Sequence, residues 1–398
     1  MNMQSLGPVI STENEPRKAG RERMRALNLQ IVLQIVHGEH TTTRAEVART
    51  TGLTRATVSS LVADLIDAKL VVEAGVAPSA GGKPPTKIRI DQGGRQLALL
   101  DLSARPFRGL LVDLLLQPIG DVALARSSDD HDTAIENLVE RLTSSATSSL
   151  LGVAVATPGV VDADGVVVEA TNLGWVDHPL GPRLAERFEV PVLVSNDAHA
   201  SAIAAHAELV RQRRSTGVAT GDLLLVRIAE GLGAGIVLGG GLHLGSHRAA
   251  GEIGHVVVDV DGEDCRCGNA GCLETIASRA AIVRAIAGTD AISPDVTLDM
   301  LGETYGASRV AEALKRAGVA IGGAASVLVN ALDVSEIVVH SASDGAEAIA
   351  EGLRGELGRR VLPALRPDLE VRTMSDPNLP LMGAAVLLRQ DQLGFVIA

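Results

Sequence analysis

The sequence CRCGNAGCLE, residues 265–274, contains every cysteine of this 398-residue chain. Three thiols placed so closely, with glycines between them, restrict this stretch to a tight loop around one centre. His255 lies ten residues before the first cysteine of the C-x-C-x₄-C pattern. Three thiolates and one imidazole form a closed tetrahedral set typical of structural zinc. We therefore predict a structural Zn²⁺ site made by His255, Cys265, Cys267 and Cys272.

Two carboxylates bracket this cysteine loop. Glu252 lies shortly before His255, and Glu274 follows the last cysteine. A metal ion would fix both ends of the loop and so place two carboxylates beside one imidazole. One imidazole nitrogen binds the metal, and the other can face a hydroxyl group of a ligand. Carboxylates and an imidazole that converge on one site suit a polyol.

Other interpretations of the cysteines stay open. They can be reduced, inert thiols, or a redox switch, although the C-x-x-C spacing of thioredoxin-like redox sites is absent. A DNA-binding zinc sensor is a further class, in which DNA affinity responds to the metal. The closed ligand set favours a permanent ion, because its removal then unfolds the loop.

The first part of the chain has the pattern of a helix-turn-helix. Thr43 and Glu46 form a capping box, which predicts a helix from Arg44 to about Thr50. Gly52 can adopt the left-handed conformation that ends this helix. Thr54 is a good N-cap for a second helix, which we expect over residues 55–68. The first 90 residues hold 12 Lys and Arg against 8 Asp and Glu, whereas the whole chain has a net charge of -12. The first 90 residues, here called the head, are thus basic, and the remainder, here called the body, is acidic. This difference indicates that nucleic-acid contact is confined to the head.

Two strands with a Gly- and Pro-rich turn, GVAPSAGGKPPT, follow these helices and predict a β-hairpin wing. Helix, turn, helix and wing in this order indicate a DNA-binding winged helix, with a small protein-interaction module as the alternative. Short polar groups and arginine suit the edges of bases in the major groove and the phosphates. The expected DNA contacts are Arg44, Thr54, Arg55, Thr57, Ser59, Ser60 and Lys83.

The rest of the chain alternates strands with helices, which indicates an α/β fold with two sheet-plus-helix halves. We expect a meander of three strands over 96–126 and helices at 134–149, 274–287, 306–331 and 344–358. A strand should end at Ser195-Asn196-Asp197 and continue into a helix, and a last helix should close the chain. The predicted units are a disordered tail over 1–20, the winged helix over 21–90 and a large domain over 95–398.

Composition excludes several classes of protein. Aromatic residues make up 1% of the chain, so few rings exist for stacking on unpaired bases, and a single-strand nucleic-acid binder is disfavoured. No secretory signal and no apolar run long enough for a membrane span is visible. We expect a cytoplasmic, nucleoid-associated protein with no membrane partner.

The stretch GEIGHVVVDVDGEDCRCGNAGCLE resembles the signature of the ROK family of repressors, open reading frames and sugar kinases. The resemblance covers about residues 95–390. With the winged helix in front, the chain is similar to the regulators of that family, such as xylose and N-acetylglucosamine repressors. It implies an actin-like, ribonuclease H-like fold with a sugar in the cleft between two lobes. Lobe one is expected over about 95–196 with the helix 379–392, and lobe two over about 197–378.

The resemblance also implies site residues. Asp197 occupies the position that serves as general base in the kinases of the family. His255 and the three cysteines match the family's zinc ligands. The positions that match sugar contacts are Asn172, Asn196, Asp197, Glu252, His255 and Glu274.

The kinases of the family need a nucleotide site, and three stretches depart from its pattern. In DLSARPFRG, Ser103 and Ala104 replace the glycines of D-x-G-G-T, and Arg105 replaces its threonine. In EGLGAGI, Leu232 is assigned to the threonine of G-T-G-x-G-x-G. The third stretch, VVHSASDG, lacks a Gly-Gly turn. Side chains at such positions block the close approach of backbone to phosphate.

We therefore expect a regulator without catalytic residues, most simply a repressor of carbohydrate uptake or catabolism genes, with an ATP-dependent sugar kinase as the alternative. Its expected effector is a monosaccharide or a sugar phosphate. Its expected partners are palindromic double-stranded operator DNA and further copies of itself in a dimer or tetramer, because two recognition helices read half-sites about one helical turn apart. Sugar binding would change the spacing of the two heads by a population shift.

Overall fold

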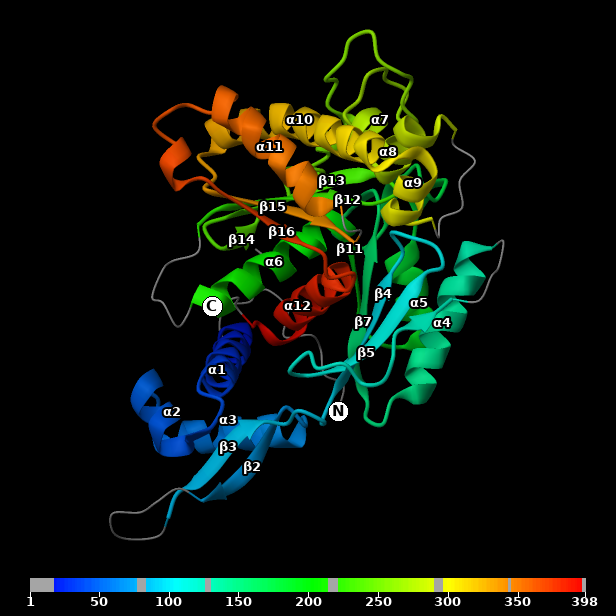
Figure 1. Cartoon of the computed structure of the whole chain (residues 1–398). Coiled ribbons are helices and arrows are strands. Elements are labelled where there is room, and N and C mark those ends of the chain that lie inside the picture. Colours follow the sequence, from blue (N-terminus) through cyan, green and yellow to red (C-terminus); the bar gives the residue numbers. More distant parts are fainter. Residues whose placement is uncertain are drawn as a thin grey trace.

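A computed structural model describes residues 18–76, 84–125, 130–213, 221–289, 296–342 and 345–395 of the chain (Figure 1). It contains a small N-terminal head and a larger body with two five-stranded sheets. The body has the predicted α/β architecture. Within the described residues, no helix is both long and apolar enough to cross a membrane.

The head consists of three helices and a small antiparallel sheet, as the sequence predicts. Its elements are α1 (Lys18–Gly38), β1 (Thr42–Thr43), α2 (Arg44–Thr51), α3 (Arg55–Asp67), β2 (Val71–Val76) and β3 (Thr86–Ile90). Residues 18–20 of the tail predicted over 1–20 are helical, because α1 begins at Lys18. The rest of that tail and the tip of the wing, with Lys83, lie outside the described residues.

The predicted signals at the ends of α2 and α3 are confirmed. The Glu46 backbone N–H donates to the Thr43 hydroxyl at 3.2 Å, and the Glu46 carboxylate accepts from the Thr43 N–H at 2.8 Å. Gly52 has a φ of 71° and ends α2 in the left-handed conformation. The Thr54 hydroxyl accepts from the Thr57 N–H at 3.2 Å. Two helix ends are thus fixed by side chains within four residues of them, which holds the turn between α2 and α3 in one shape.

Lobe one is built on a sheet in the order β11-β7-β4-β5-β6, in which β4, β5 and β6 form the predicted antiparallel meander. Its strands are β4 (Gln96–Asp101), β5 (Arg108–Asp113), β6 (Ala123–Leu124), β7 (Leu150–Thr157) and β11 (Val192–Asn196). The helices α4 (His131–Ser145) and α5 (Leu180–Phe188) and a small sheet of β8 (Val160–Val161), β9 (Val167–Ala170) and β10 (Trp175–His178) complete it. Helix α4 begins three residues before the predicted start, because the Asp130 side chain caps it.

Lobe two is built on a sheet in the order β14-β13-β12-β15-β16. Its strands are β12 (Leu223–Ile228), β13 (Leu232–Leu238), β14 (Gly241–Leu242), β15 (Glu336–Ser341) and β16 (Glu370–Met374). Its helices are η1 (Ile253–His255), α7 (Glu274–Ala277), α8 (Arg279–Ala287), α9 (Leu298–Tyr305), α10 (Ala307–Leu332), α11 (Ala346–Arg360) and η2 (Arg366–Asp368). The single helix predicted over 274–287 is wrong: Ser278 is extended (ψ 160°) and its hydroxyl caps α8, so the helix is broken there.

Two long helices, α6 (Asp197–Arg213) and α12 (Leu379–Leu393), lie between the two large sheets (Figure 1). Helix α6 packs on β12 and β13, and α12 packs on β4, β7 and β11. The helices also pack tightly on each other. A Cβ at Gly383 would lie 1.7 Å from the Ala200 carbonyl oxygen, so this approach requires glycine in α12. A shift of one lobe against the other therefore has to be accommodated at the contact between α6 and α12.

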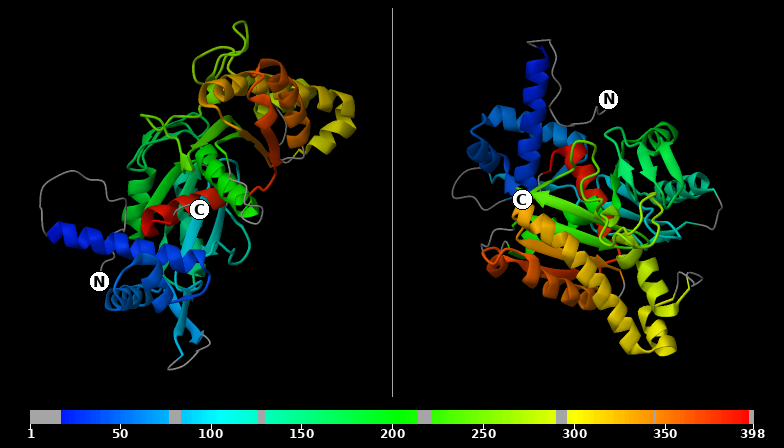
Figure 2. Two further views of the ribbon diagram at one scale, coloured as in Figure 1. Left: turned by 90° about the vertical axis from the view of Figure 1, so that its left-hand side faces the viewer. Right: turned by 90° about the horizontal axis from the view of Figure 1, so that it is seen from above.

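The head and lobe one share a hydrophobic core. Buried residues of the head such as Val36 and Leu65 belong to the same cluster as Leu97 of β4 and Leu388 of α12. At its edge the His37 ring of α1 lies 4.6 Å from the ring of Phe395, just beyond α12. Figures 1 and 2 show α1 beside the C-terminal end of α12. This shared burial fixes the head to lobe one and to the end of α12.

Candidate functional site

All six residues that match the sugar contacts line one cavity of about 60 Å³ between the lobes. They come from segments far apart in the chain: the turn between β9 and β10, the end of β11, the start of α6, the short helix η1 with its N-cap, and the start of α7. The cavity is lined by Asn172, Asn196, Asp197, Glu252, His255 and Glu274, together with glycines and backbone of β12 and β13.

Asn172 offers this cavity an unused acceptor, since its Oδ1 atom is buried and has no hydrogen-bond partner in the described structure. A buried amide oxygen without a partner is costly, and a ligand hydroxyl would satisfy it. Gly231 keeps the space open: a Cβ there would lie 2.7 Å from Glu274 Oε2 and 3.1 Å from Asn172 Nδ2. A side chain at this position would displace the Glu274 carboxylate, so glycine here leaves that carboxylate and the Asn172 amide in place.

Asn196 and Asp197 form the junction between β11 and α6. The Asn196 side chain accepts from the backbone N–H groups of Ala198 and His199 at 2.9 and 3.0 Å and donates to the Gly159 carbonyl at 2.9 Å. It therefore caps α6 and fixes Asp197 as the first residue of that helix. Burial raises the pKa of Asp197, and the positive charge of Arg227 acts in the opposite direction.

Glu252 and Glu274 face the cavity from the two ends of the cysteine loop. Glu274 Oε2 accepts from the Leu232 N–H at 3.0 Å, which leaves its other oxygen near Arg266 at 3.6 Å. Burial, and then the charges of Asp197 and Glu274, raise the pKa of Glu252 to about 7. Three carboxylates crowded in one buried space are stabilised by hydrogen-bond donors, and a polyol supplies several hydroxyl donors at once.

His255 connects this cavity to the predicted metal site. Its Nδ1 atom lies 3.7 Å from Cys265 Sγ, and its Nε2 atom lies 3.9 Å from Glu252 Oε2. One ring nitrogen thus points toward the sulfurs and the other toward the carboxylate side. A histidine held in this way orients both groups at once.

The four predicted metal ligands come together in space. Their ligand atoms all lie within 4.8 Å of one another, and Cys267 Sγ and Cys272 Sγ are 3.6 Å apart. Tetrahedral zinc with Zn–S of about 2.3 Å and Zn–N of about 2.0 Å requires S···S of roughly 3.8 Å and S···N of roughly 3.6 Å. The donor set and its spacing therefore fit a structural zinc ion.

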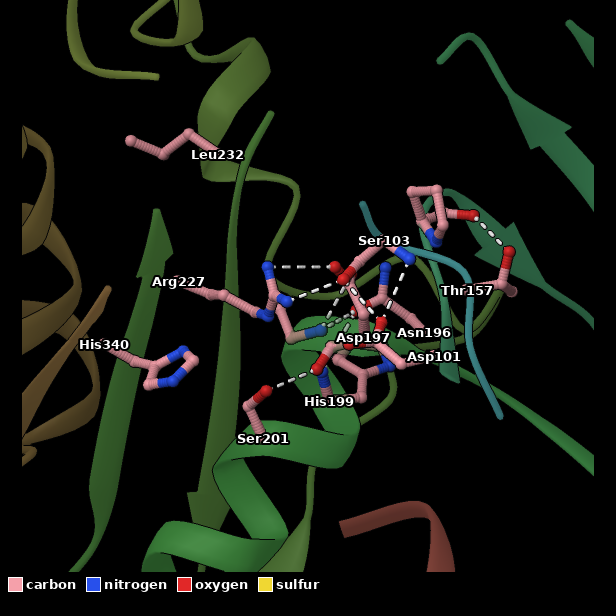
Figure 3. A network of polar contacts seen from close by, with 12 residues as sticks. Asp101, Ser103, Thr157, Asn196, Asp197, His199, Ser201, Arg227, Leu232 and His340 are labelled. Carbon is pink, nitrogen blue, oxygen red and sulfur yellow. Dashed lines mark hydrogen bonds and ion pairs between the residues drawn. The ribbon is translucent and has the colours of Figure 1, made fainter. Parts of the chain in front are cut away.

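Arg227 is a site residue that the sequence analysis missed. It lies in β12, and Figure 3 shows its guanidinium directed at the start of α6 and the loop after β4. Its Nη1 atom lies 3.3 Å from Asp197 Oδ2, and its Nη2 atom donates to Ser103 Oγ at 2.7 Å. A single arginine in the otherwise apolar strand LLLVRI was the signal for it, because a charge in a buried strand needs a partner.

A second, larger cavity of about 370 Å³ adjoins the first, and Ser103, Arg227 and Ala229 line both. The stretch DLSARPFRG and the turn after β12 form one side of it. The assignment of Leu232 to this side is wrong. Its side chain is buried in the core of lobe two and points away from Asp197 (Figure 3), whereas Glu230 of the same turn lines the second cavity.

The third stretch that the sequence analysis assigned to a nucleotide site, VVHSASDG, contributes His340, Ser341 and Ala342 to the same cavity. Its residues 343–344 lie outside the described chain. All three stretches assigned to a nucleotide site therefore reach one place, although they are separated by more than a hundred residues each.

The predicted DNA contacts lie on the head, and the structure divides them. Arg55, Ser59 and Ser60 are exposed on α3, and Thr54 is exposed at its N-cap. The other two described residues make internal contacts: Arg44 is paired with Glu73 at 2.9 Å, and Thr57 bonds to Thr54. The exposed Ser60 also accepts from Arg25 at 3.3 Å. Lys83 lies outside the described residues.

The sequence of this chain is similar to a known protein family and to characterised relatives. The profile of the ROK family matches residues 100–391. A xylose repressor of Caldicellulosiruptor bescii is 26% identical over 400 residues, which cover 94% of this chain and 98% of the relative.

Two solved structures share the fold. A ROK family transcriptional regulator, described as a homolog of the E. coli MLC protein, has a TM-score of 0.74 at 23% identity and covers 93% of this chain and 98% of its own. A ROK family glucokinase from Streptomyces griseus in complex with glucose and AMPPNP has a TM-score of 0.61 at 24% identity, over 74% of this chain and 99% of its own. The predicted actin-like α/β fold is confirmed.

Proposed function

The chain belongs to the ROK family, and from this we propose that it is a DNA-binding transcriptional regulator whose operator affinity changes when a monosaccharide or a derivative binds between its lobes. Repression of carbohydrate uptake or catabolism genes is the simplest form of this function. The observation that carries the proposal is the common core of the head and lobe one, which joins a helix-turn-helix to a body with a polyol-like site.

The polar cavity between the lobes is the proposed sugar site. The crowded carboxylates of Asp197, Glu252 and Glu274 and the unpartnered oxygen of Asn172 all require donors, which sugar hydroxyls provide. His255 Nε2 lies on the same side and can take part in a hydroxyl contact. Because these groups come from both lobes, a bound sugar favours one relative position of the lobes over another.

His255, Cys265, Cys267 and Cys272 would hold a structural zinc ion. Zinc supplies a fixed tetrahedral anchor and no open coordination position for chemistry. With the loop anchored, Glu252 and Glu274 at its two ends are kept beside the sugar site.

The ion pair between Asp197 and Arg227 favours regulation over phosphoryl transfer. A kinase needs this carboxylate free to take a proton from the sugar hydroxyl, next to positioned phosphates. Here Arg227 is paired with Asp197, and Ser103, which takes the place of a glycine, bonds to the same arginine. The buried guanidinium occupies the side of Asp197 that faces the second cavity, where an incoming phosphoryl group would have to lie.

The path from the sugar site to the head runs through α6 and α12. Asp197 begins α6, and α6 packs along α12. Phe395, just beyond the end of α12, lies beside His37 of α1. A movement of the lobes that shifts α6 therefore displaces the end of α12 and with it the head. In a dimer on a palindromic operator, this changes the spacing of the two α3 helices. An operator-bound dimer or tetramer in the cytoplasm completes the proposal.

The test has two steps. A thermal-shift screen of neutral monosaccharides and sugar phosphates identifies the ligand, since a compound that binds the folded state raises the melting temperature. Operator DNA selected from random sequence is then titrated with the full chain in the presence and absence of that ligand. We expect a palindromic site and a change of at least tenfold in its affinity. Rapid ATP consumption with any sugar, or operator affinity that no sugar alters, would contradict the proposal.

A further inference from the structure

The loop between β14 and η1 carries an arginine in an unusual backbone conformation. Arg248 has a φ of 57°, in the left-handed region, and the other residues of this loop with positive φ are glycines, Gly245 and Gly251. A Cβ crowds the backbone in this region, which therefore favours glycine. Residues with side chains keep such a conformation where the surrounding structure enforces it, and such positions cluster at functional sites.

The loop is held to lobe two on two sides. The Gly251 carbonyl accepts from the Ala234 N–H of β13 at 2.8 Å. The His199 ring of α6 lies with its Nε2 atom 2.6 Å from the Ala250 carbonyl oxygen. A carbonyl only accepts, so this Nε2 atom carries the proton and donates. The backbone that follows Arg248 is thus fixed to both β13 and α6.

The Arg248 side chain crosses from lobe two to lobe one. Its Nε–H donates to the Val161 carbonyl of β8 at 3.2 Å. Glu252 lies four positions after Arg248, and Gly159 lies two positions before Val161. Both Glu252 and Gly159 line the proposed sugar cavity. The hydrogen bond therefore joins two segments, one from each lobe, that form part of the wall of this cavity.

Neither charge pairing nor backbone preference accounts for an arginine at this position. Arg248 has no carboxylate within 4.0 Å among the described residues, and the Val161 carbonyl is its side-chain partner there. Arg213 of the same lobe, in contrast, pairs with the carboxylate of Glu336. Glycine would adopt the left-handed backbone more easily than arginine does. What distinguishes Arg248 is its contact with the other lobe.

A second arginine of lobe two makes a similar contact inside the cavity. Arg227 donates to the Ser103 hydroxyl of lobe one at 2.7 Å, and both residues line the sugar cavity. Arg248 does not line it. An effect of Arg248 on sugar binding therefore has to act through the position of the lobes, whereas Arg227 also faces the ligand.

We propose that Arg248 is a positioning residue that clamps the two lobes together beside the sugar cavity. This inference rests on the proposed function, because the clamp acts on the proposed sugar site. The hydrogen bond to Val161 stabilises the arrangement in which residues of both lobes line one cavity. The apparent affinity for a ligand is proportional to the fraction of the protein in the arrangement that binds it. Loss of the clamp lowers this fraction and so weakens sugar binding without removing a sugar contact.

Two replacements of Arg248 separate its guanidinium from its backbone. Arg248→Gly removes the donor and suits the left-handed conformation, so the loop keeps its fold. Arg248→Lys keeps a positively charged donor on a long side chain. Glu189→Gly is the matched control: Glu189 is exposed, has a φ of 52° at the end of α5, and does not line the cavity.

Calorimetric titration of the full chain with the monosaccharide from the thermal-shift screen gives the first readout. We expect binding roughly three- to tenfold weaker in Arg248→Gly, as loss of one hydrogen bond implies. Arg248→Lys should bind within about twofold of the parent, because its ammonium group can donate to the same carbonyl. Glu189→Gly should bind as the parent does. All titrations are made at a temperature at which circular dichroism shows each variant folded.

Small-angle X-ray scattering without sugar gives the second readout. The lobes of Arg248→Gly should separate more often, so its radius of gyration should exceed that of the parent and of Glu189→Gly in the same oligomeric state. This measurement needs no ligand. If no sugar binds to the parent, the proposed function fails, and the scattering still decides whether Arg248 clamps the lobes.

Three results would overturn the clamp. The first is equal sugar affinity in Arg248→Gly and the parent. The second is an equal loss of affinity in Arg248→Gly and either Arg248→Lys or the control, since a donor at position 248 would then be irrelevant. The third is the same radius of gyration for Arg248→Gly and the parent.

Discussion

Replacing Arg227 with methionine should destabilise the chain, because it leaves Asp197 in a buried place without its positive partner. The two side chains are 8% and 13% exposed, and Nη1 and Oδ2 are 3.3 Å apart. Removal of one partner from a buried ion pair costs about 3–5 kcal/mol, whereas replacement of both partners by neutral groups costs far less. We therefore expect Arg227→Met to lower the free energy of unfolding by about 3–5 kcal/mol at neutral pH, and Asp197→Asn/Arg227→Met to recover most of it.

The loss should depend on pH in a defined direction. Burial raises the pKa of Asp197 in the folded chain, and Arg227 opposes this rise. Without Arg227 the pKa of Asp197 rises further above its unfolded value, so the folded state binds the proton more strongly than the unfolded state. Stability then falls as pH increases between the unfolded and the folded pKa. The deficit of Arg227→Met should be smallest at acid pH and largest at neutral and alkaline pH.

Urea unfolding of the parent, both single variants and the double variant at pH 5 and pH 8 measures these effects. Arg187→Met is the control, because Arg187 pairs with Glu136 and Glu140 on the surface and its loss should cost less than about 1 kcal/mol. A deficit that is the same at both pH values, together with simple additivity of the two single variants, would refute the account of this buried pair.

Three further predictions concern the pocket, the head and the connection between them. Gly231→Ala should weaken sugar binding at least tenfold, because its Cβ would lie 2.7 Å from Glu274 Oε2; equal affinities by calorimetry would show that the gap is not used. Arg55→Ala should weaken operator binding, because Arg55 is exposed on α3. The ratio of operator affinities with and without sugar should stay the same in this variant. Unchanged affinity in a DNA titration would exclude Arg55 from the DNA interface. Phe395→Ala should lower the free energy of unfolding by about 3 kcal/mol, because Phe395 is 5% exposed and its ring contacts His37 and Arg389. The variant should also reduce the effect of sugar on operator binding. A full sugar response in a variant of confirmed lower stability would exclude the path through α12 to the head.

Local signals in the sequence predicted much of the molecule. The capping box at Thr43 and the left-handed Gly52 act within a few residues, so a helix end can be inferred from its own segment. The cysteine spacing likewise predicted a cluster that the structure brings within 4.8 Å. Each of these features depends on neighbours in the chain and needs no knowledge of the rest of the fold.

The features that the sequence did not predict depend on contacts between distant segments. Arg227 meets Ser103 across more than a hundred residues, and only its position in an apolar strand hinted at a buried partner. Leu232 and Glu230 are two residues apart, and the pairing of Ile228 with Leu232 decides which of them faces the second cavity. The common core of the head and lobe one could not be predicted either. The spacing of apolar residues shows which face of an element is buried, but it does not identify the surface against which that face packs.

The central claim is that the cysteine loop holds the carboxylates of the sugar site in place. Calorimetric affinity of the identified monosaccharide for Cys267→Ser, compared with the parent at a temperature at which both are folded, tests it most directly. The account predicts binding at least tenfold weaker, because loss of one of four ligands loosens the loop that carries Glu252 and Glu274. Equal affinity in the variant and the parent would contradict it.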